Sequence, residues 1–243
     1  MLHLLAALAR NREGMTLADL TEHSRLPKST VLSLLRALEG GGYVVKAQGS
    51  YTLGNEALKL GAAMVEGPRF PPSVRVALEQ LAAATGESAL LATLVTDEPL
   101  AVYVDVIESQ ATIRFTVPVG GRRPLYCTAV GLVLLAFQPQ SYRDGYLRSL
   151  RPKRYTESTI TDKARLEREI ARIREDGVGV SLDLMIDGAG GVAAPVRNGS
   201  GAVIAVVAAG CPSARLIAKR DHLIACTRRC ADEISALLGY SGA

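Results

Sequence analysis

A short basic stripe between residues 28 and 36 is the part of this 243-residue sequence best suited to contact nucleic acid. In a helix, Lys28, Ser29, Ser33 and Arg36 fall on one face. Short hydroxyl side chains let a helix lie deep in a major groove, and Lys and Arg supply contacts to phosphate or guanine. A polar stripe on an isolated helix is more often plain solvated surface. Its meaning therefore depends on the elements around it.

A glycine-rich run at residues 188–193 formally fits the G-x-G-x-x-A fingerprint of dinucleotide binding. That fingerprint needs a helix directly after the glycines, because the helix N-terminus binds the pyrophosphate. A short apolar run containing Pro195 follows instead, which argues against a nucleotide site. The sequence also lacks G-x-S-x-G, P-loop and H-E-x-x-H motifs. We therefore expect neither an enzyme nor a bound cofactor.

The cysteines offer two further possibilities for chemistry. Cys127 follows a Gly-Gly-Arg-Arg-Pro loop and could act as a nucleophile or redox thiol, although a packed or cavity-lining cysteine is the more common case. His222, Cys226 and Cys230 recur every four residues, on one face of a helix. The outer two are about 12 Å apart at a rise of ~1.5 Å per residue, too far to share one tetrahedral ion. We expect no metal site.

The composition is that of a globular protein, with 48% apolar and 21% charged residues and a formal net charge of +4. No apolar stretch reaches the roughly 18 residues that span a bilayer, and the N-terminus lacks the regions of a signal peptide. We expect a cytoplasmic protein without a membrane partner. The net charge does not by itself indicate nucleic acid, but four cations stand against one acid between residues 24 and 53.

The first 54 residues predict a winged helix-turn-helix. Apolar residues recur with helical spacing in three short segments, and Gly40-Gly41-Gly42 ends the third. Two short strands joined by a turn follow. Three helices and a hairpin in this order are the winged plan, with the third helix as the recognition helix and the hairpin as the wing. The expected helices cover 1–11, 17–23 and 27–39, and the expected strands 43–46 and 51–53.

This segment closely resembles the DNA-binding domain of the IclR family of transcriptional regulators. The matching runs are Thr16-Leu17-Ala18-Asp19-Leu20, Leu26-Pro27-Lys28-Ser29-Thr30-Val31, Leu34-Leu35-Arg36-Ala37-Leu38, Gly42-Tyr43-Val44 and Tyr51-Thr52-Leu53-Gly54. One departure is Ser33, where the family commonly carries Arg. The residues expected to contact DNA are Thr16, Arg25, Lys28, Ser29, Thr30, Ser33, Arg36, Lys46 and Gln48.

The rest of the chain predicts a linker helix over 55–66, within an interdomain segment 55–71, and an effector-binding domain over 72–243. Strands with inserted helices and hairpin-compatible turns predict an α+β fold rather than repeated βαβ units. The expected helices cover 74–85, 128–137, 140–150, 162–176 and 213–238, and the expected strands 88–95, 100–107, 111–119, 178–184, 192–196 and 202–209.

The resemblance to the IclR family continues through this second domain. The matching runs are 119–125, 128–131, 159–162, Gly188 with 192–196, and 233–235. The resemblance implies a GAF-like fold, in which a six-stranded antiparallel sheet has helices on both faces. It also implies a homodimer through the N-terminal domains, often assembled into a homotetramer.

Family members that bind small organic acids line their cavity from the helix after the Gly-Gly loop and from the later strands. At the matching positions this chain has smaller or less polar residues: the family often has Asp at Ser181, Cys at Gly191, and Ser at Ala208 and Gly210. We expect a larger and more apolar effector, such as an aromatic one, with Phe115 as a stacking surface. The alternative is a domain without a ligand, in which neighbouring side chains fill the space. The residues expected to contact effector are Thr112, Phe115, Arg123, Ala129, Val130, Ser181, Ala189, Gly191, Ala208 and Gly210.

Together these features predict a ligand-responsive regulator that binds an inverted repeat in double-stranded DNA. The leading interpretation is a repressor of a catabolic operon that a small organic effector releases from DNA. An activator of the same family remains an alternative, because the sign of control depends on where the DNA site lies. A redox sensor or enzyme that uses Cys127 is the alternative from another class.

Overall fold

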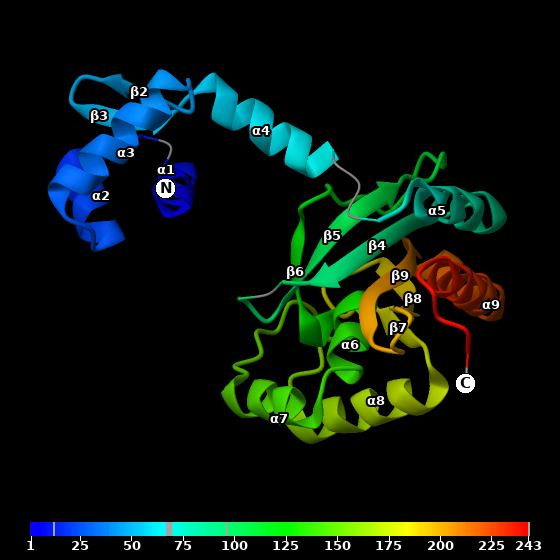
Figure 1. Ribbon diagram of the computed structural model, residues 1–243. Coiled ribbons are helices and arrows are strands. Elements are labelled where there is room, and N and C mark those ends of the chain that lie inside the picture. The colour runs from blue at the N-terminus through cyan, green and yellow to red at the C-terminus, as the bar shows by residue number, and fades with distance from the viewer. Residues whose placement is uncertain (12, 67–69, 96, 243) are drawn as a thin grey trace. The chain divides into compact units, whose positions relative to one another are not determined.

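Two units of structure, Met1–Pro68 and Arg69–Ala243, divide the chain. The computed structural model, drawn in Figure 1, describes residues 1–11, 13–66, 70–95 and 97–242. None of the helices in these ranges combines the length and the apolar character that a membrane crossing requires. Each unit has its own hydrophobic core.

The first unit is built from short helices and a three-stranded antiparallel sheet of order β1-β3-β2. Its core gathers apolar side chains from the first three helices and the hairpin, including Leu4, Leu20 and Leu35. The two-residue strand β1 was not expected, because two residues are too few to show an alternating pattern. The elements are α1 (Leu2–Arg10), β1 (Met15–Thr16), α2 (Leu17–Ser24), α3 (Lys28–Gly40), β2 (Val44–Ala47), β3 (Ser50–Leu53) and α4 (Asn55–Glu66).

Local chemistry sets the ends of these elements. Thr16 and Asp19 form a capping box at the start of α2, in which each side chain accepts a hydrogen bond from the other residue's backbone N–H. The hairpin turns through Gln48 and Gly49, with φ of 50° and 85°. Two positive φ values in a two-residue turn are typical of type I′, which matches the right-handed twist of the paired strands.

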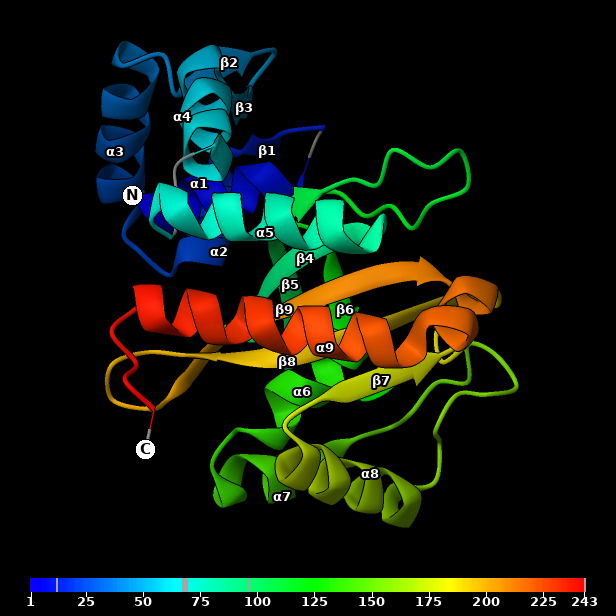
Figure 2. The ribbon, with the colours of Figure 1, turned by 90° about the vertical axis from the view of Figure 1, so that its right-hand side faces the viewer.

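The second unit contains a six-stranded antiparallel sheet of order β6-β5-β4-β9-β8-β7. Figure 2 shows α5 and α9 on one face of this sheet, with α6, α7 and α8 on the other. The elements are α5 (Pro72–Thr85), β4 (Ser88–Leu94), β5 (Leu100–Ile107), β6 (Arg122–Pro124), the 3₁₀ turn η1 (Leu125–Cys127), α6 (Ala129–Ala136), α7 (Gln140–Ser149), α8 (Lys163–Asp176), β7 (Gly179–Leu182), β8 (Ala189–Arg197), β9 (Val203–Pro212) and α9 (Ser213–Leu237).

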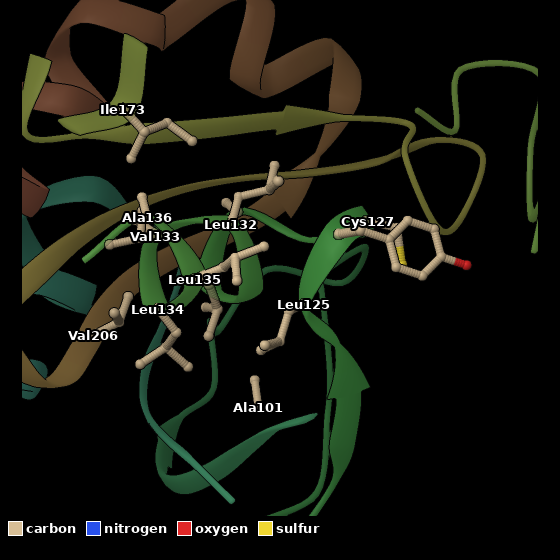
Figure 3. Close-up of a cluster of buried hydrophobic side chains, with 14 of the residues drawn as sticks. Ala101, Leu125, Cys127, Leu132, Val133, Leu134, Leu135, Ala136, Ile173 and Val206 are labelled. Carbon is tan, nitrogen blue, oxygen red and sulfur yellow. The ribbon is translucent and has the colours of Figure 1, made fainter. Parts of the chain in front are cut away.

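The central strands of the sheet are buried on both faces. Side chains alternate between the faces of a strand, so Leu90 and Leu91 on β4 join different clusters. Leu90 packs in the cluster that surrounds α6, where every residue of that helix is buried. Figure 3 shows Leu132, Leu135 and Val206 within this cluster. Leu91 packs in the cluster formed with α5 and α9.

The expected strand at 111–119 is wrong, because the structure has an irregular segment there. Its carbonyl groups bond to side chains rather than to a neighbouring strand: Ser88 donates to the Phe115 carbonyl at 2.7 Å and Arg215 to the Ile113 carbonyl at 2.8 Å. The sixth strand of the sheet is instead the short β6, which pairs with β5. Branched and aromatic residues in 111–119 gave a strand-like pattern, but the segment is a loop in which Val117 is buried and Ile113 is exposed.

The N-terminal half of α6 lies unusually close to the segment that precedes it. A Cβ built on Gly131 would fall 2.5 Å from Leu125 Cα and 2.7 Å from the Pro124 carbonyl oxygen. Both contacts are with backbone, which cannot rotate away as a side chain can. Glycine at position 131 therefore permits this close approach between α6 and the chain that leads into it.

We expect Gly131→Ala to lower the free energy of unfolding by about 1–3 kcal/mol, because the added methyl overpacks this contact. The matched control is Gly145→Ala in α7, where a Cβ meets nothing within 4 Å. That change should stabilise by about 0.5–1 kcal/mol through helix propensity. Urea unfolding followed by circular dichroism measures both, and equal effects of the two substitutions would contradict the packing argument.

Candidate functional site

The exposed face of α3 carries five of the polar residues predicted to contact DNA: Lys28, Ser29, Thr30, Ser33 and Arg36. The opposite face holds the buried side chains of Val31, Leu35 and Leu38. The core therefore fixes the helix by one face and leaves the basic face open to solvent. Within the described part of the chain, no carboxylate lies within 4.0 Å of the Lys28 or Arg36 side-chain nitrogens, so both cations are available to a polyanion.

The other four predicted DNA contacts are also exposed and lie in the same unit. Arg25 adopts a left-handed conformation, with φ of 55°, in the turn before α3. Lys46 and Gln48 belong to the β2–β3 hairpin, and Lys46 Nζ lies 5.5 Å from the centre of the Tyr51 ring. The hydroxyl of Thr16 donates to Asp19 at 2.7 Å, so it already has a structural role at the start of α2.

A cavity with a volume of about 50 Å³ lies in the second unit, between the start of α6 and the sheet. The lining is mostly apolar and comes from elements distant in the sequence. It consists of Leu90, Tyr103, Phe115, Arg123, Cys127, Thr128, Ala129, Val130, Ser181, Leu184, Met185, Ile186, Ala189, Gly190, Gly191, Ala208, Ala209 and Gly210.

Strand register explains why the sheet is hollow at this point. Ser181 on β7, Gly191 on β8 and Gly210 on β9 are direct neighbours across the sheet. In the adjacent row on the same face, Ala193 pairs with Ala208. Small side chains in two neighbouring rows cannot reach the overlying helix, so space remains under the start of α6.

A few polar groups face this apolar lining. Arg123 lies beside Tyr103, and among the described residues no carboxylate lies within 4.0 Å of its guanidinium. Its Nη1 donates to the carbonyl of Arg122 at 2.8 Å. Burial raises the pKa of Tyr103 to about 12, although the charge of Arg123 opposes this shift. Tyr103 is therefore a neutral hydroxyl at physiological pH, and Arg123 is the positive charge of the lining.

The thiol of Cys127 is ill-suited to nucleophilic or redox chemistry. Its side chain is buried, and this burial raises the pKa of the thiol to about 12, against a smaller opposing effect of Arg123. At neutral pH the group is almost entirely protonated, whereas the thiolate is the reactive form. Cys127 fits the role of an apolar lining residue.

All residues predicted to contact effector line this cavity except Thr112, which is exposed and outside the lining. The irregular course of 111–119 explains the difference, because Phe115 points inward while Thr112 does not. Sequence reasoning missed Leu90, Tyr103, Thr128, the segment 184–186, Gly190 and Ala209. Alternation along β5 could have indicated Tyr103, since it shares a face with the buried Ala101, but no local pattern marks 184–186.

Nothing in the described ranges gathers three or more His, Cys, Asp or Glu side chains in a form that could hold a metal ion. Within α9, the Cys226 sulfur lies 3.7 Å from His222 Nε2, and the Cys230 thiol donates to the Ala77 carbonyl at 3.5 Å. These contacts are those of helix packing between α5 and α9.

Comparison with known proteins assigns both units. The sequence profile of the IclR helix-turn-helix domain matches residues 1–48, and that of the bacterial transcriptional regulator IclR C-terminal domain matches residues 71–236. The chain belongs to the IclR family. It is therefore a DNA-binding transcriptional regulator, and not an enzyme, with a C-terminal effector domain of the IclR type.

Relatives of this IclR-family chain match over nearly its whole length. It is 32% identical to the HTH-type transcriptional regulator KdgR of Escherichia coli K12, over 98% of this chain and 90% of KdgR. It is 30% identical to the DNA-binding transcriptional repressor YiaJ of the same organism, over 99% and 86%. The crystal structure of an IclR transcriptional regulator from Alicyclobacillus acidocaldarius superposes with a TM-score of 0.73 at 28% identity, covering 97% and 96%.

We expect Arg36→Ala to weaken binding to DNA by about 1–3 kcal/mol, because an exposed cation of the recognition helix is lost. A gel shift on the DNA upstream of the protein's own gene, repeated at several salt concentrations, measures the change. The matched control is Arg148→Ala, which removes an exposed arginine from α7 in the other unit. Equal losses in both variants would mean that only total charge matters and would contradict the assignment to α3.

Proposed function

We propose that this IclR-family regulator is a repressor of a catabolic operon and that a small organic effector bound in the α6 cavity releases it from DNA. The observation that carries the proposal is a mostly apolar cavity with an arginine in its wall that no described carboxylate neutralises. The similarity to the repressor YiaJ supports the sign of control. The protein acts in the cytoplasm as a homodimer or homotetramer, and its DNA site is an inverted repeat.

The lining favours an effector with an anionic group on an apolar body. Arg123 offers a charge-assisted hydrogen bond to a carboxylate, and the hydroxyls of Tyr103 and Ser181 add neutral polar groups. Ala129 and Val130, the first residues of α6, also belong to the lining. Leu90, Phe115 and the segment 184–186 would surround the rest of the ligand. An aromatic acid combines these features.

Release from DNA follows from a shift in population. A ligand that binds better to one conformation increases the fraction of molecules in that conformation, in proportion to its differential affinity. The effector therefore needs to favour a state in which the two recognition helices of a dimer no longer match the spacing of the half-sites.

An effector panel tests this function directly. Calorimetric titration compares glyoxylate and pyruvate with aromatic acids and with their esters and amides, and gel shifts then measure release of DNA. We expect the aromatic acids to bind more tightly than the small keto acids, because they bury more apolar surface. Tight binding of the keto acids alone would contradict the proposed effector class. An increase in DNA binding on addition of effector would favour the activator.

Removing the charge of Arg123 tests whether this residue contacts the carboxylate of the effector. We expect Arg123→Ala to lower the affinity for an aromatic acid by about 1.5–3 kcal/mol, since a hydrogen bond to a charged group is lost, while the uncharged amide loses little. The matched control is Arg122→Ala, because Arg122 is exposed and bonds to Glu98 at 3.0 Å. Calorimetry on both variants decides, and an equal loss for acid and amide would contradict a carboxylate contact.

The redox alternative makes the opposite prediction for Cys127. Because its pKa is about 12, we expect slow alkylation by iodoacetamide at pH 7 and faster reaction only as the pH rises toward that value. Cys127→Ser should leave the response of DNA binding to peroxide unchanged. A peroxide response that the wild-type protein shows and Cys127→Ser lacks would favour the redox sensor instead.

A further inference from the structure

The ring of Phe115 occupies the space that a side chain at position 210 would fill. A Cβ built on Gly210 would lie 2.7 Å from Phe115 Cδ1 and 3.2 Å from Leu90 Cδ1. The space gained by having glycine at 210 is thus not empty, because Phe115 enters it from the irregular 108–121 segment above the sheet. Phe115 is half-buried and packs against the cluster around α6.

The backbone of Phe115 is tied to the sheet directly beside Gly210. Ser88 pairs with Gly210 across β4 and β9. Its hydroxyl donates to the Phe115 carbonyl at 2.7 Å and accepts from the Ser109 N–H at 3.0 Å. The Ser109 hydroxyl in turn donates to the Gly86 carbonyl at 2.6 Å. These bonds set the height of Phe115 above the cavity floor.

An ion pair between the buried Glu87 and the partly exposed Arg215 holds the same segment two residues earlier. The Glu87 side chain is 1% exposed and accepts from Arg215 Nε at 2.6 Å and from Nη2 at 2.7 Å. The same Nη2 donates to the Ile113 carbonyl at 2.8 Å. Arg215 therefore joins the turn before β4, the first turn of α9 and the segment that carries Phe115.

We propose that Phe115 is the residue that sets the size of effector this cavity accepts, and that the Glu87–Arg215 pair is the positioning device that holds its ring over Gly210. The inference rests on the proposed function, in which the cavity is the effector site. The cavity is small while the ring is in place, so a larger acid has to displace the ring at the expense of the contacts that hold it. A variant without the ring should bind large acids without that cost.

The test is the affinity profile of the full chain for three carboxylates of rising size, namely pyruvate, benzoate and 2-naphthoate, measured by calorimetry. In Phe115→Ala we expect affinity for 2-naphthoate to rise by about tenfold or more relative to pyruvate, from the apolar surface newly buried. The matched control is Phe137→Ala, which removes a ring that stacks on Arg197 at 5.0 Å outside the cavity. An unchanged profile in Phe115→Ala, including no binding of any acid, overturns the size assignment.

The positioning role has a readout of its own. The chain has three phenylalanines, so labelling with 4-fluorophenylalanine gives three fluorine resonances, and Phe115→Leu assigns one of them. The neutral pair Glu87→Gln with Arg215→Met keeps the bulk of both side chains and leaves no lone buried charge. We expect it to shift or broaden the Phe115 resonance alone and to move the acid profile in the direction of Phe115→Ala. A Phe115 resonance that stays in place, with the profile unchanged, overturns the positioning role.

Failure of the inference can be distinguished from failure of the proposed function, because the acid profile is measured without DNA. If the profile shifts in Phe115→Ala but no acid alters DNA binding, the size assignment stands and the effector function fails. If acids release DNA from the wild-type protein but the profile does not shift, the function stands and the size assignment is overturned.

Discussion

The second unit depends on one constraint, which is that the middle strands of its sheet are buried on both faces. In β4 and β9, residues that point to α6 alternate with residues that point to α5 and α9, and both sets are apolar apart from the buried Ser88. A sheet buried in this way needs helices on both sides, since each uncovered face would leave a large apolar surface in water. The helix layers, the closely packed α6 and the position of the cavity all follow from this requirement.

The cavity is the place where this double burial is incomplete. Cores are packed to nearly crystalline density, so space next to a buried sheet arises only where small residues coincide in neighbouring strands. The row of Ser181, Gly191 and Gly210 does this on the α6 side. Gly131 then lets α6 lie close to the segment that precedes it, because a Cβ at this position would meet the backbone of Leu125 and Pro124. The sheet on one side of the cavity and α6 on the other are regular elements. The irregular segment that carries Phe115 is therefore the part of the lining that can adjust.

Periodicity in the sequence predicts the regular elements of both units well, and it predicts the site less completely. The pattern of α3 separates a buried face from a basic face, and the structure has the same separation. The segment 111–119 has the composition of a strand, yet its backbone bonds to Ser88 and Arg215, which are distant in the sequence. Tyr103 and residues 184–186 reach the cavity through tertiary packing alone. The resemblance to the IclR family predicted cavity positions that the periodicity of the sequence could not indicate.

The segment that carries Phe115 forms one wall of the cavity, and strands β4, β9 and β8 form its floor. The bonds that hold this wall differ in kind from those that hold the floor. The floor is a continuous backbone ladder between β4, β9 and β8, whereas the wall depends on a few side-chain bonds to backbone carbonyls. Breaking one such bond costs about 0.5–1.5 kcal/mol, or up to ~3 where a charged group donates, far less than opening a sheet. A ligand of ordinary affinity therefore has enough free energy to move the wall and not the floor. Because Arg215 lies in the first turn of α9, any such movement of the wall also changes the contacts at the start of that helix.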